Sequence, residues 1–220
     1  MNIVEVNTIS KKFKQAESDI VVLQNLSFNV KAGETLAVVG QSGSGKSTLL
    51  SLLAGLDEPD SGSVNIINQN LATFNQSQLS KFRGENIGII FQQFHLMKGL
   101  TALENVMLPL DIIGTNDVEK KALDALKIVG LEHRSHHLPQ QLSGGEMQRV
   151  AIARACVVQP RILLADEPSG NLDLVTGTQV MDQLFDAVSE RGMTMILVTH
   201  DQALASRCHR QLILQTGHSQ

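Results

Sequence analysis

The sequence predicts an α/β protein built on a parallel sheet, and three apolar segments carry this prediction. One precedes a glycine-rich stretch at residues 40–48, and the other two occupy residues 161–165 and 193–199. All three are short enough for strands that are buried on both faces. Each runs directly into polar residues, and the carboxyl ends of parallel strands form the edge where ligands bind. We therefore expect Asp166 and His200 at the same edge as the glycine-rich stretch.

The N-terminal segment predicts two strands of an antiparallel β layer. Ile3 to Val6 mark the first strand and residues 21–30 the second, with a polar loop at residues 15–19 between them. Phe13 precedes this loop in a chain without Trp or Tyr, so it is one of the few flat surfaces on which an adenine could stack. A position in the core is an equally good interpretation of Phe13 from its residue type.

Residues 40–48 fit the spacing G-x-x-x-x-G-K-[ST] of a phosphate-binding P-loop. Its glycines let successive backbone N–H groups turn inward around phosphates. Lys46 supplies a charge for the β- and γ-phosphates, and the Ser47 hydroxyl is placed to bind Mg²⁺. The nucleotide-binding residues predicted here are Gly40, Gln41, Ser42, Gly43, Ser44, Gly45, Lys46, Ser47 and Thr48.

Apolar segments flank this loop on both sides. Residues 36–39 predict a buried strand before it, and a helix after it would point its positive N-terminus at the anion. That helix is predicted from Leu49, Leu50, Leu52, Leu53 and Leu56. A strand, a loop and a helix in this order are the core unit of a P-loop NTPase.

Short elements follow this helix. Residues 57–62 predict a turn, residues 63–68 a strand, residues 76–83 a short helix and residues 87–91 an apolar strand. Gln92 ends the last of these strands, where its amide oxygen could reach a metal ion or an attacking water. From its residue type alone, Gln92 is more typical of a polar loop.

The middle of the chain predicts a helical subdomain at roughly residues 93–160. Thr101 and Glu104 have the spacing of a capping box at a helix start. Residues 117–129 place apolar side chains on one helix face, and Gly130 ends that helix. A third helix is predicted through residue 158.

The third helix starts at Leu-Ser-Gly-Gly-Glu, residues 142–146, where Ser143 and Glu146 form a second capping box. A capped helix does not explain Gly144 and Gly145, because glycine is among the poorest residues for a helix. The pair suggests that something approaches the backbone closely there. Bare N–H groups at a helix start suit an anion.

Two adjacent acids, Asp166 and Glu167, end the buried segment at residues 161–165. Carboxylates are costly in that position unless they serve a cation or a reaction. We expect Asp166 to hold Mg²⁺ and Glu167 to polarise the attacking water. A tight loop at residues 169–173 and a helix at residues 175–188 follow.

Composition argues against several classes of protein. A net charge of −4 and 3% aromatic residues give no footprint for nucleic acid. Cys156 and Cys208 are isolated, as expected for reduced, packed thiols in a cytosolic protein. The sequence lacks a signal-peptide pattern and a stretch of about 20 apolar residues, so we expect a soluble chain.

These motifs, in this order, resemble an ATP-binding cassette (ABC) ATPase subunit. Leu-Ser-Gly-Gly-Glu followed by Gln148-Arg149 is that family's signature motif, and the resemblance runs from Ile3 to about Leu214. Residues 55–57, 100–106, 165–173 and 199–201 further resemble the lipoprotein-release and macrolide-export branch. Members of that branch work with a separate membrane permease.

The resemblance implies one domain, residues 1–220, that forms a head-to-tail homodimer around two ATP molecules. Each ATP would lie between one copy's P-loop and the other copy's Ser143, Gly144 and Gly145. By the same resemblance, Phe13 stacks on adenine, Gln92 links metal, water and permease, and Glu167 is the catalytic base. Asp173 lies in the loop that crosses to the other copy, and His200 contacts the γ-phosphate. Phe replaces the usual Tyr at Phe13, and Asn68 stands at a turn where glycine is common.

Three classes of function compete. The leading prediction is a transport ATPase, peripheral on the cytoplasmic face of the bacterial inner membrane, that docks a permease near His95, Leu96 and Met97. The alternative is a soluble ABC ATPase for DNA repair or translation. Those proteins carry a long coiled-coil insertion or tandem cassettes, and this sequence shows neither. A GTPase or kinase would leave the signature motif without a purpose. The sequence leaves the transported molecule, and the choice between export, lipoprotein release and mechanical coupling, open.

Overall fold

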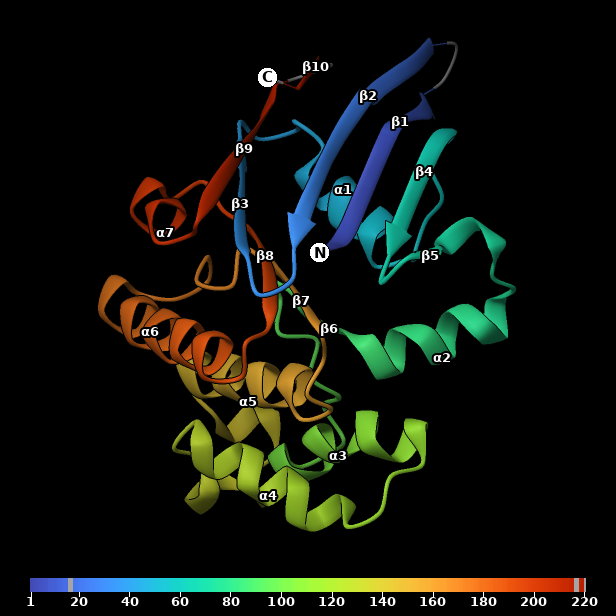
Figure 1. Cartoon of the computed structure of the whole chain (residues 1–220). Helices are drawn as coiled ribbons and strands as arrows, with labels where there is room; N and C mark the ends of the chain where they lie inside the picture. The colour runs from blue at the N-terminus through green and yellow to red at the C-terminus, as the bar shows by residue number, and fades with distance from the viewer. Residues whose placement is uncertain (16–17, 216–217, 220) are drawn as a thin grey trace. The chain divides into compact units, whose positions relative to one another are not determined.

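The computed structural model describes residues 1–15, 18–215 and 218–219 and divides the chain into two compact units (Figure 1). Unit 1 comprises Met1–Arg83 and Thr194–Gln220, and unit 2 comprises Gly84–Met193. Ala16 and Glu17, in the polar loop predicted near the N-terminus, lie outside the described residues. The glycine-rich stretch belongs to unit 1, and the helical middle of the chain to unit 2.

Unit 1 contains the predicted antiparallel layer, with strand order β2-β1-β4-β5. Its strands are β1 Asn2–Gln15, β2 Ser18–Lys31, β4 Ser61–Ile66 and β5 Gln69–Asn70. Val4 pairs with Val30 on one side and Ile66 on the other, and all three are fully buried. The strand predicted at residues 63–68 ends at Ile66, because Ile67 and Asn68 adopt left-handed φ values of 53° and 61°. Asn tolerates that conformation better than most residues, which agrees with its place in a turn.

Unit 1 also contains parallel strands. β3 Thr35–Gly40 lies between β8 Thr194–Val198 and β9 Arg210–Gln215, parallel to both, and β10 His218–Ser219 pairs antiparallel with β9. The buried segment predicted before the glycine-rich stretch is therefore a central strand, and Leu36, Ala37 and Val38 are fully buried. The helical elements of this unit are α1 Lys46–Leu53, η1 Leu71–Thr73, α7 Gln202–Ser206 and α2 Gln76–Asn86, whose last residues belong to unit 2.

Helix α1 ends at Leu53, so the prediction that Leu56 belongs to it is wrong. Gly55 follows with φ of 59°, a left-handed conformation that turns the chain and ends the helix. Leu79 of α2 fills the space beside Gly55, where a Cβ would lie 2.8 Å from Leu79 Cδ1. Leu56 is left 54% exposed in the turn that follows.

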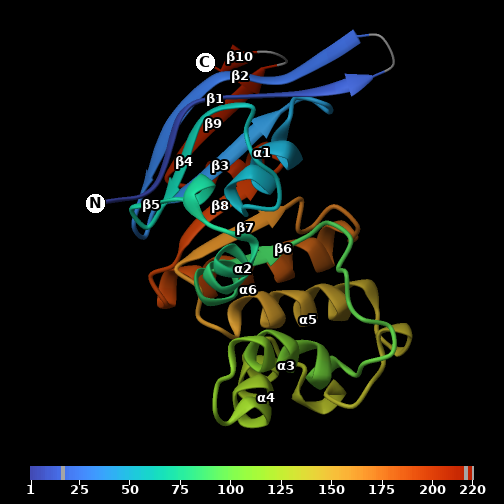
Figure 2. The same cartoon turned by 90° about the vertical axis from the view of Figure 1, so that its right-hand side faces the viewer.

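Unit 2 pairs β6 Ile87–Ile90 with β7 Ile162–Asp166 in parallel register. Its α-helices are α3 Ala102–Ile113, α4 Val118–Ile128, α5 Gly144–Cys156 and α6 Leu174–Glu190, with short turns η2 Glu132–Arg134 and η3 Pro139–Gln141. Helices α3, α4 and α5 pack against one another (Figure 2). The capping boxes predicted at Thr101 and Ser143 are both present, and α5 ends at Cys156, two residues earlier than predicted.

Two further expectations concern the cysteines and membrane spans. Cys156 and Cys208 are free and buried, as predicted, and burial raises the pKa of each thiol to about 11. Among the residues that the structure describes, no helix combines the length and apolar character needed to cross a bilayer.

Candidate functional site

The glycine-rich stretch folds into a phosphate cradle at the end of β3. Gly43 and Gly45 have φ of 80° and 91°, which L side chains rarely adopt. A Cβ at Gly45 would also lie 2.8 Å from Val22 Cγ1, so strand β2 packs directly against the loop. Helix α1 begins at Lys46 with no side chain capping its N-terminus. Its first N–H groups are therefore available to an anion.

The residues of this cradle fit a polyphosphate. Lys46 Nζ donates to the carbonyl oxygens of Gly40 and Gln41, at 2.9 Å each, so the ammonium lies over the loop. The Ser44 hydroxyl is buried, and within the described part of the chain it has no hydrogen-bond partner. A buried hydroxyl without a partner is costly, and a phosphate oxygen would satisfy it. Ser47, in the first turn of α1, is exposed and offers an oxygen ligand of the kind that Mg²⁺ prefers.

Phe13 is exposed rather than part of the core. The residue is 45% exposed on β1, and Lys11 Nζ lies 5.4 Å from the ring centroid. Phe13 pairs across the strands with Ile20, two residues before Val22, which contacts the P-loop at Gly45. An apolar platform formed by Phe13 and Ile20 thus lies on the hairpin that packs against the phosphate cradle.

His200 and the P-loop follow neighbouring parallel strands of unit 1. Val38 of β3 pairs with Val198 of β8, so both strands end at the same edge, as predicted. Beyond His200, the Asp201 carboxylate accepts from Ala203 N at 2.7 Å and caps α7. His200 itself is exposed at this edge.

Unit 2 has an equivalent edge, where β6 and β7 end side by side. Ile90 pairs with Ala165, so Gln92 and the acidic pair Asp166-Glu167 follow the same ends of parallel strands. Glu167 has φ of 46°, an uncommon conformation for a residue with a side chain. Backbone strain of this kind clusters at functional positions. Asp166 and Glu167 are both half-buried.

The segment after Gln92 is held by two elements of unit 2. Asn171 Nδ2 donates to the Gln92 carbonyl oxygen at 2.7 Å, so the loop after β7 contacts this segment. Arg154, in the last turn of α5, donates to the carbonyl oxygens of His95 and Phe94 at 2.7 and 2.9 Å. Helix α5 therefore connects the Gln92 segment to the signature residues at its own N-terminus.

Ser143 begins α5 and is exposed. Its hydroxyl accepts from Glu146 N at 3.3 Å, and its own N–H donates to Glu146 Oε2 at 2.8 Å. That N–H, together with Arg134, holds the pKa of the Glu146 carboxyl below its usual value. Ser143 is thus fixed through its hydroxyl and its backbone.

The close approach predicted at the glycine pair is present at Gly145, and the neighbour is Thr176 of the same chain. A Cβ at Gly145 would overlap Thr176 Cγ2 in α6. At Gly144, a Cβ would make only an ordinary contact, 3.6 Å from Leu172 Cδ2. Packing of α5 against α6 therefore requires a glycine at 145, whereas no contact within unit 2 requires one at 144.

Asp173 caps α6 at the end of the tight loop. Its Oδ1 accepts from Thr176 N at 3.0 Å, and hydrogen bonds from Thr176 lower the pKa of the carboxyl. The side chain is exposed. This capping role would fix the loop before α6 whether or not Asp173 contacts another copy of the chain.

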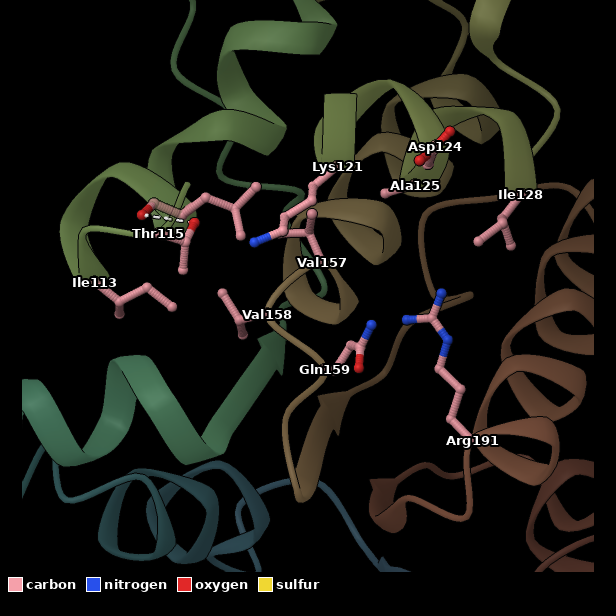
Figure 3. A pocket seen from close by; sticks show the side chains of 11 residues that line it. Ile113, Thr115, Lys121, Asp124, Ala125, Ile128, Val157, Val158, Gln159 and Arg191 are labelled. Carbon is pink, nitrogen blue, oxygen red and sulfur yellow. Dashed lines mark hydrogen bonds between the residues drawn. The ribbon is translucent and has the colours of Figure 1, made fainter. Parts of the chain in front are cut away.

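A separate cavity of about 410 Å³ opens in unit 2 beside α3, α4 and the segment after α5 (Figure 3). Lys121, Gln159 and Arg191 point their polar ends into this opening. Arg191 Nη1 also donates to Cys156 O at 3.0 Å, at the C-terminus of α5. None of the described residues that line the cavity is among those predicted for nucleotide binding or hydrolysis.

Sequence reasoning missed the residues that hold the site residues in place. Arg134, Arg154 and Thr176 belong to this group, and each acts through a contact between segments distant in the sequence. For Arg154 a signal was available, because a helix that starts at Ser143 places residue 154 three turns further on. No local pattern marks Arg134 or Thr176.

Comparison with known proteins shows which family the chain belongs to. The profile of the family named ABC transporter matches residues 23–170. YbbA of Escherichia coli, named as an ABC transporter ATP-binding protein, is 48% identical over 100% of this chain and 97% of its own length. LolD of Geobacter metallireducens, a lipoprotein-releasing system ATP-binding protein, is 45% identical over 98% of this chain and 97% of its own length.

A solved structure shares the fold along the whole chain. It is a dimeric post-hydrolysis state of the ATP-binding cassette MJ0796 bound to ADP and Pi. It matches with a TM-score of 0.91 and 41% sequence identity, covering 99% of this chain and 96% of the other. The predicted combination of a P-loop NTPase fold, an antiparallel β layer and helices is thereby confirmed.

Proposed function

Because the chain belongs to the ABC transporter family, we propose that it binds and hydrolyses ATP as a homodimer and thereby drives a separate membrane permease. The observation that carries the proposal is the phosphate cradle of unit 1. Two left-handed glycines, an uncapped helix start, a lysine and a buried hydroxyl with no partner among the described residues converge on one loop. The backbone turned by the glycines, the helix start and the lysine favour a polyphosphate over a neutral ligand, and a phosphate oxygen could also accept from the buried hydroxyl.

In unit 1, different residues would bind the base and the phosphates of ATP. The backbone N–H groups of residues 41–48 and Lys46 Nζ would donate to the phosphate oxygens, which Lys46 can do by leaving the carbonyls of Gly40 and Gln41. Phe13 would stack on the adenine. His200, at the same edge of the sheet, would donate to the γ-phosphate.

Hydrolysis requires a water that is oriented and deprotonated as it attacks. We assign that role to Glu167, whose carboxylate would accept the proton, and to Gln92, whose amide oxygen would orient the same water. Mg²⁺, when bound, would neutralise charge on the β- and γ-phosphates. Ser47, Gln92 and Asp166 offer the hydroxyl, amide and carboxylate oxygens suited to hold it.

The second copy of the chain would complete each site. Ser143, Gly144 and Gly145 would donate to the nucleotide held by the partner's P-loop, and Asp173 would contact the partner. The dimeric state of the MJ0796 cassette supports this assignment. ATP binding would close the dimer, and hydrolysis would open it.

The permease would couple the closing and opening of the dimer to transport. It would also hold the chain on the cytoplasmic face of the inner membrane. We assign docking to the segment after Gln92. Met97 is 56% exposed there, while Leu96 is half-buried. An exposed thioether side chain in a segment fixed by Arg154 suits a hydrophobic contact with a helix of another protein. The named role of the LolD relatives favours a lipoprotein-release or export system.

Co-purification tests the coupling to a permease. The chain is co-expressed with its genomic neighbour permease, membranes are solubilised in detergent, and the permease is captured by an affinity tag. We expect the ATPase to co-purify, and Met97→Asp to abolish this. Leu56→Asp, at a side chain of similar exposure in unit 1, is the matched control. Recovery of an active ATPase entirely in the soluble fraction would instead favour the soluble ABC ATPase.

A further inference from the structure

Arg134 connects two groups next to the signature residues. Its Nε donates to Glu146 Oε1 at 3.1 Å, and its Nη1 lies 3.1 Å from His137 Nε2. The Glu146 side chain is only 16% exposed and that of Arg134 is 38% exposed, so water screens this ion pair less than a surface pair. One guanidinium therefore spans the loop after α4 and the first turn of α5.

The contacts continue from Glu146 to Ser143. One carboxylate oxygen of Glu146 accepts from Arg134, and the other accepts from Ser143 N. The loop that carries Arg134 is itself fixed to α3, because Ala102 N donates to His137 O at 2.8 Å and Leu103 N to Ser135 O at 2.9 Å. Ser143 is thus connected to α3 through Glu146 and Arg134.

We propose that Arg134 is a positioning residue for Ser143, and that His137 makes this positioning sensitive to pH. The proposal rests on the proposed function, in which Ser143 contacts the nucleotide of the partner copy. Arg134 acts through Glu146, which fixes where the Ser143 hydroxyl and the first N–H groups of α5 point. Losing this ion pair would weaken closure of the dimer around ATP without removing any group that contacts ATP.

The pH sensitivity follows from the chemistry of the two side chains. A guanidinium can only donate hydrogen bonds, so His137 Nε2 must accept and must be unprotonated when it binds Arg134. Protonation removes the acceptor and places two cations together. Protonation of His137 therefore removes one of the two acceptors that orient the Arg134 guanidinium beside Glu146.

The neighbouring charged groups do not reproduce this effect. Glu146 of α5 is separated from His137 by the Arg134 side chain. The pKa of the Glu146 carboxyl is lowered, so this group stays ionised throughout the range in which histidine titrates. Glu104 of α3 has a pKa lowered mainly by the Thr101 backbone N–H, with His136 contributing, so it also stays ionised. His133 and His136 are the nearby histidines in the same loop, and His133→Gln and His136→Gln variants control for them.

The first experiment measures ATP-driven dimerisation by sedimentation, in full-length Glu167→Gln protein with Mg²⁺ and ATP. We expect Arg134→Ala to weaken the dimer roughly tenfold, the scale of one charge-assisted hydrogen bond. Arg134→Lys keeps the charge but can reach only one of the two partners, so it should recover part of the loss. Arg161→Ala removes an exposed arginine at the far end of β7 and should leave dimerisation unchanged.

The second experiment repeats the measurement between about pH 5.5 and 8, the range in which histidine titrates. His137→Gln keeps a neutral acceptor at every pH, so part of the acid weakening should disappear. In the Arg134→Ala protein, His137→Gln should change nothing further, because the two side chains act on one contact. Should Arg134→Ala fail to fold, the His137→Gln profile compared with His136→Gln decides the question.

The outcomes separate the inference from the proposed function. If Glu167→Gln protein does not dimerise with ATP at any pH, the proposed function fails and the inference fails with it. If it dimerises, and Arg134→Ala dimerises equally well or His137→Gln has the parent pH profile, only the positioning role of Arg134 and His137 is overturned.

Discussion

The contact between Gly145 and Thr176 predicts that substitutions at the two signature glycines change the stability of the protein by different amounts. Gly145→Ala adds a methyl group that overlaps Thr176 Cγ2. The threonine cannot easily turn aside, because a β-branched side chain in a helix has few rotamers. We expect this overpacking to cost about 1–3 kcal/mol, partly offset by up to about 1 kcal/mol from the better helix propensity of alanine.

Two matched variants separate the overlap from other effects. Thr176→Ser removes Cγ2 and keeps the hydroxyl, so Gly145→Ala should become neutral or slightly stabilising in that background. Gly144→Ala adds the same methyl group one residue earlier, where it would lie 3.6 Å from Leu172 Cδ2, an ordinary van der Waals contact. It should not destabilise the protein.

Urea unfolding followed by circular dichroism measures these differences, since the chain has no Trp or Tyr for fluorescence. The expected coupling free energy between residues 145 and 176 is about 1–3 kcal/mol. Equal stability of Gly145→Ala and Gly144→Ala would refute the packing argument, and so would additive effects in the double variant.

Three further predictions concern the base, the adenine and the buried thiols. Glu167→Gln should keep ATP binding and lose about 10²- to 10⁴-fold in turnover, and normal hydrolysis by this variant would remove Glu167 from its role as base. Phe13→Ala should weaken ATP binding by about 1–3 kcal/mol in calorimetry, while unchanged affinity in folded protein would argue against stacking. The Cys156 and Cys208 thiols have a pKa raised from 9.0 to about 11, so the unfolded chain loses their protons first and stability should fall between these values. In Cys156→Ala, the free energy of unfolding should fall less steeply between these pH values. An unchanged steepness would contradict the linkage.

Local patterns predicted the elements that position the site, because their signals lie within a few residues. The P-loop spacing, the buried strand before it and both capping boxes each depend on residues within an eight-residue stretch or less. The end of α1 was harder, since Leu56 continues an apolar run. The turn depends on Gly55 accommodating Leu79, which lies 24 residues further along the chain.

The same contrast between local patterns and contacts distant in the sequence explains why the reason for Gly145 was missed. Gly144 and Gly145 look equivalent in the sequence, and both suggested an approaching ligand. Only the fold brings Thr176 against Gly145, so the packing reason for that glycine could not be predicted. The exposure of Phe13 likewise depends on how β1 and β2 pair, which its residue type does not encode.

The mass of the protein in solution tests the central proposal most directly. Glu167→Gln protein is analysed by size-exclusion chromatography with light scattering, with and without Mg²⁺ and ATP. We predict the 23.9 kDa mass of a single chain without nucleotide and twice that mass with it. Adding Ser143→Arg should return the protein to the single-chain mass in ATP. A Glu167→Gln protein that binds ATP and stays at 23.9 kDa would contradict the proposed ATP-dependent dimer.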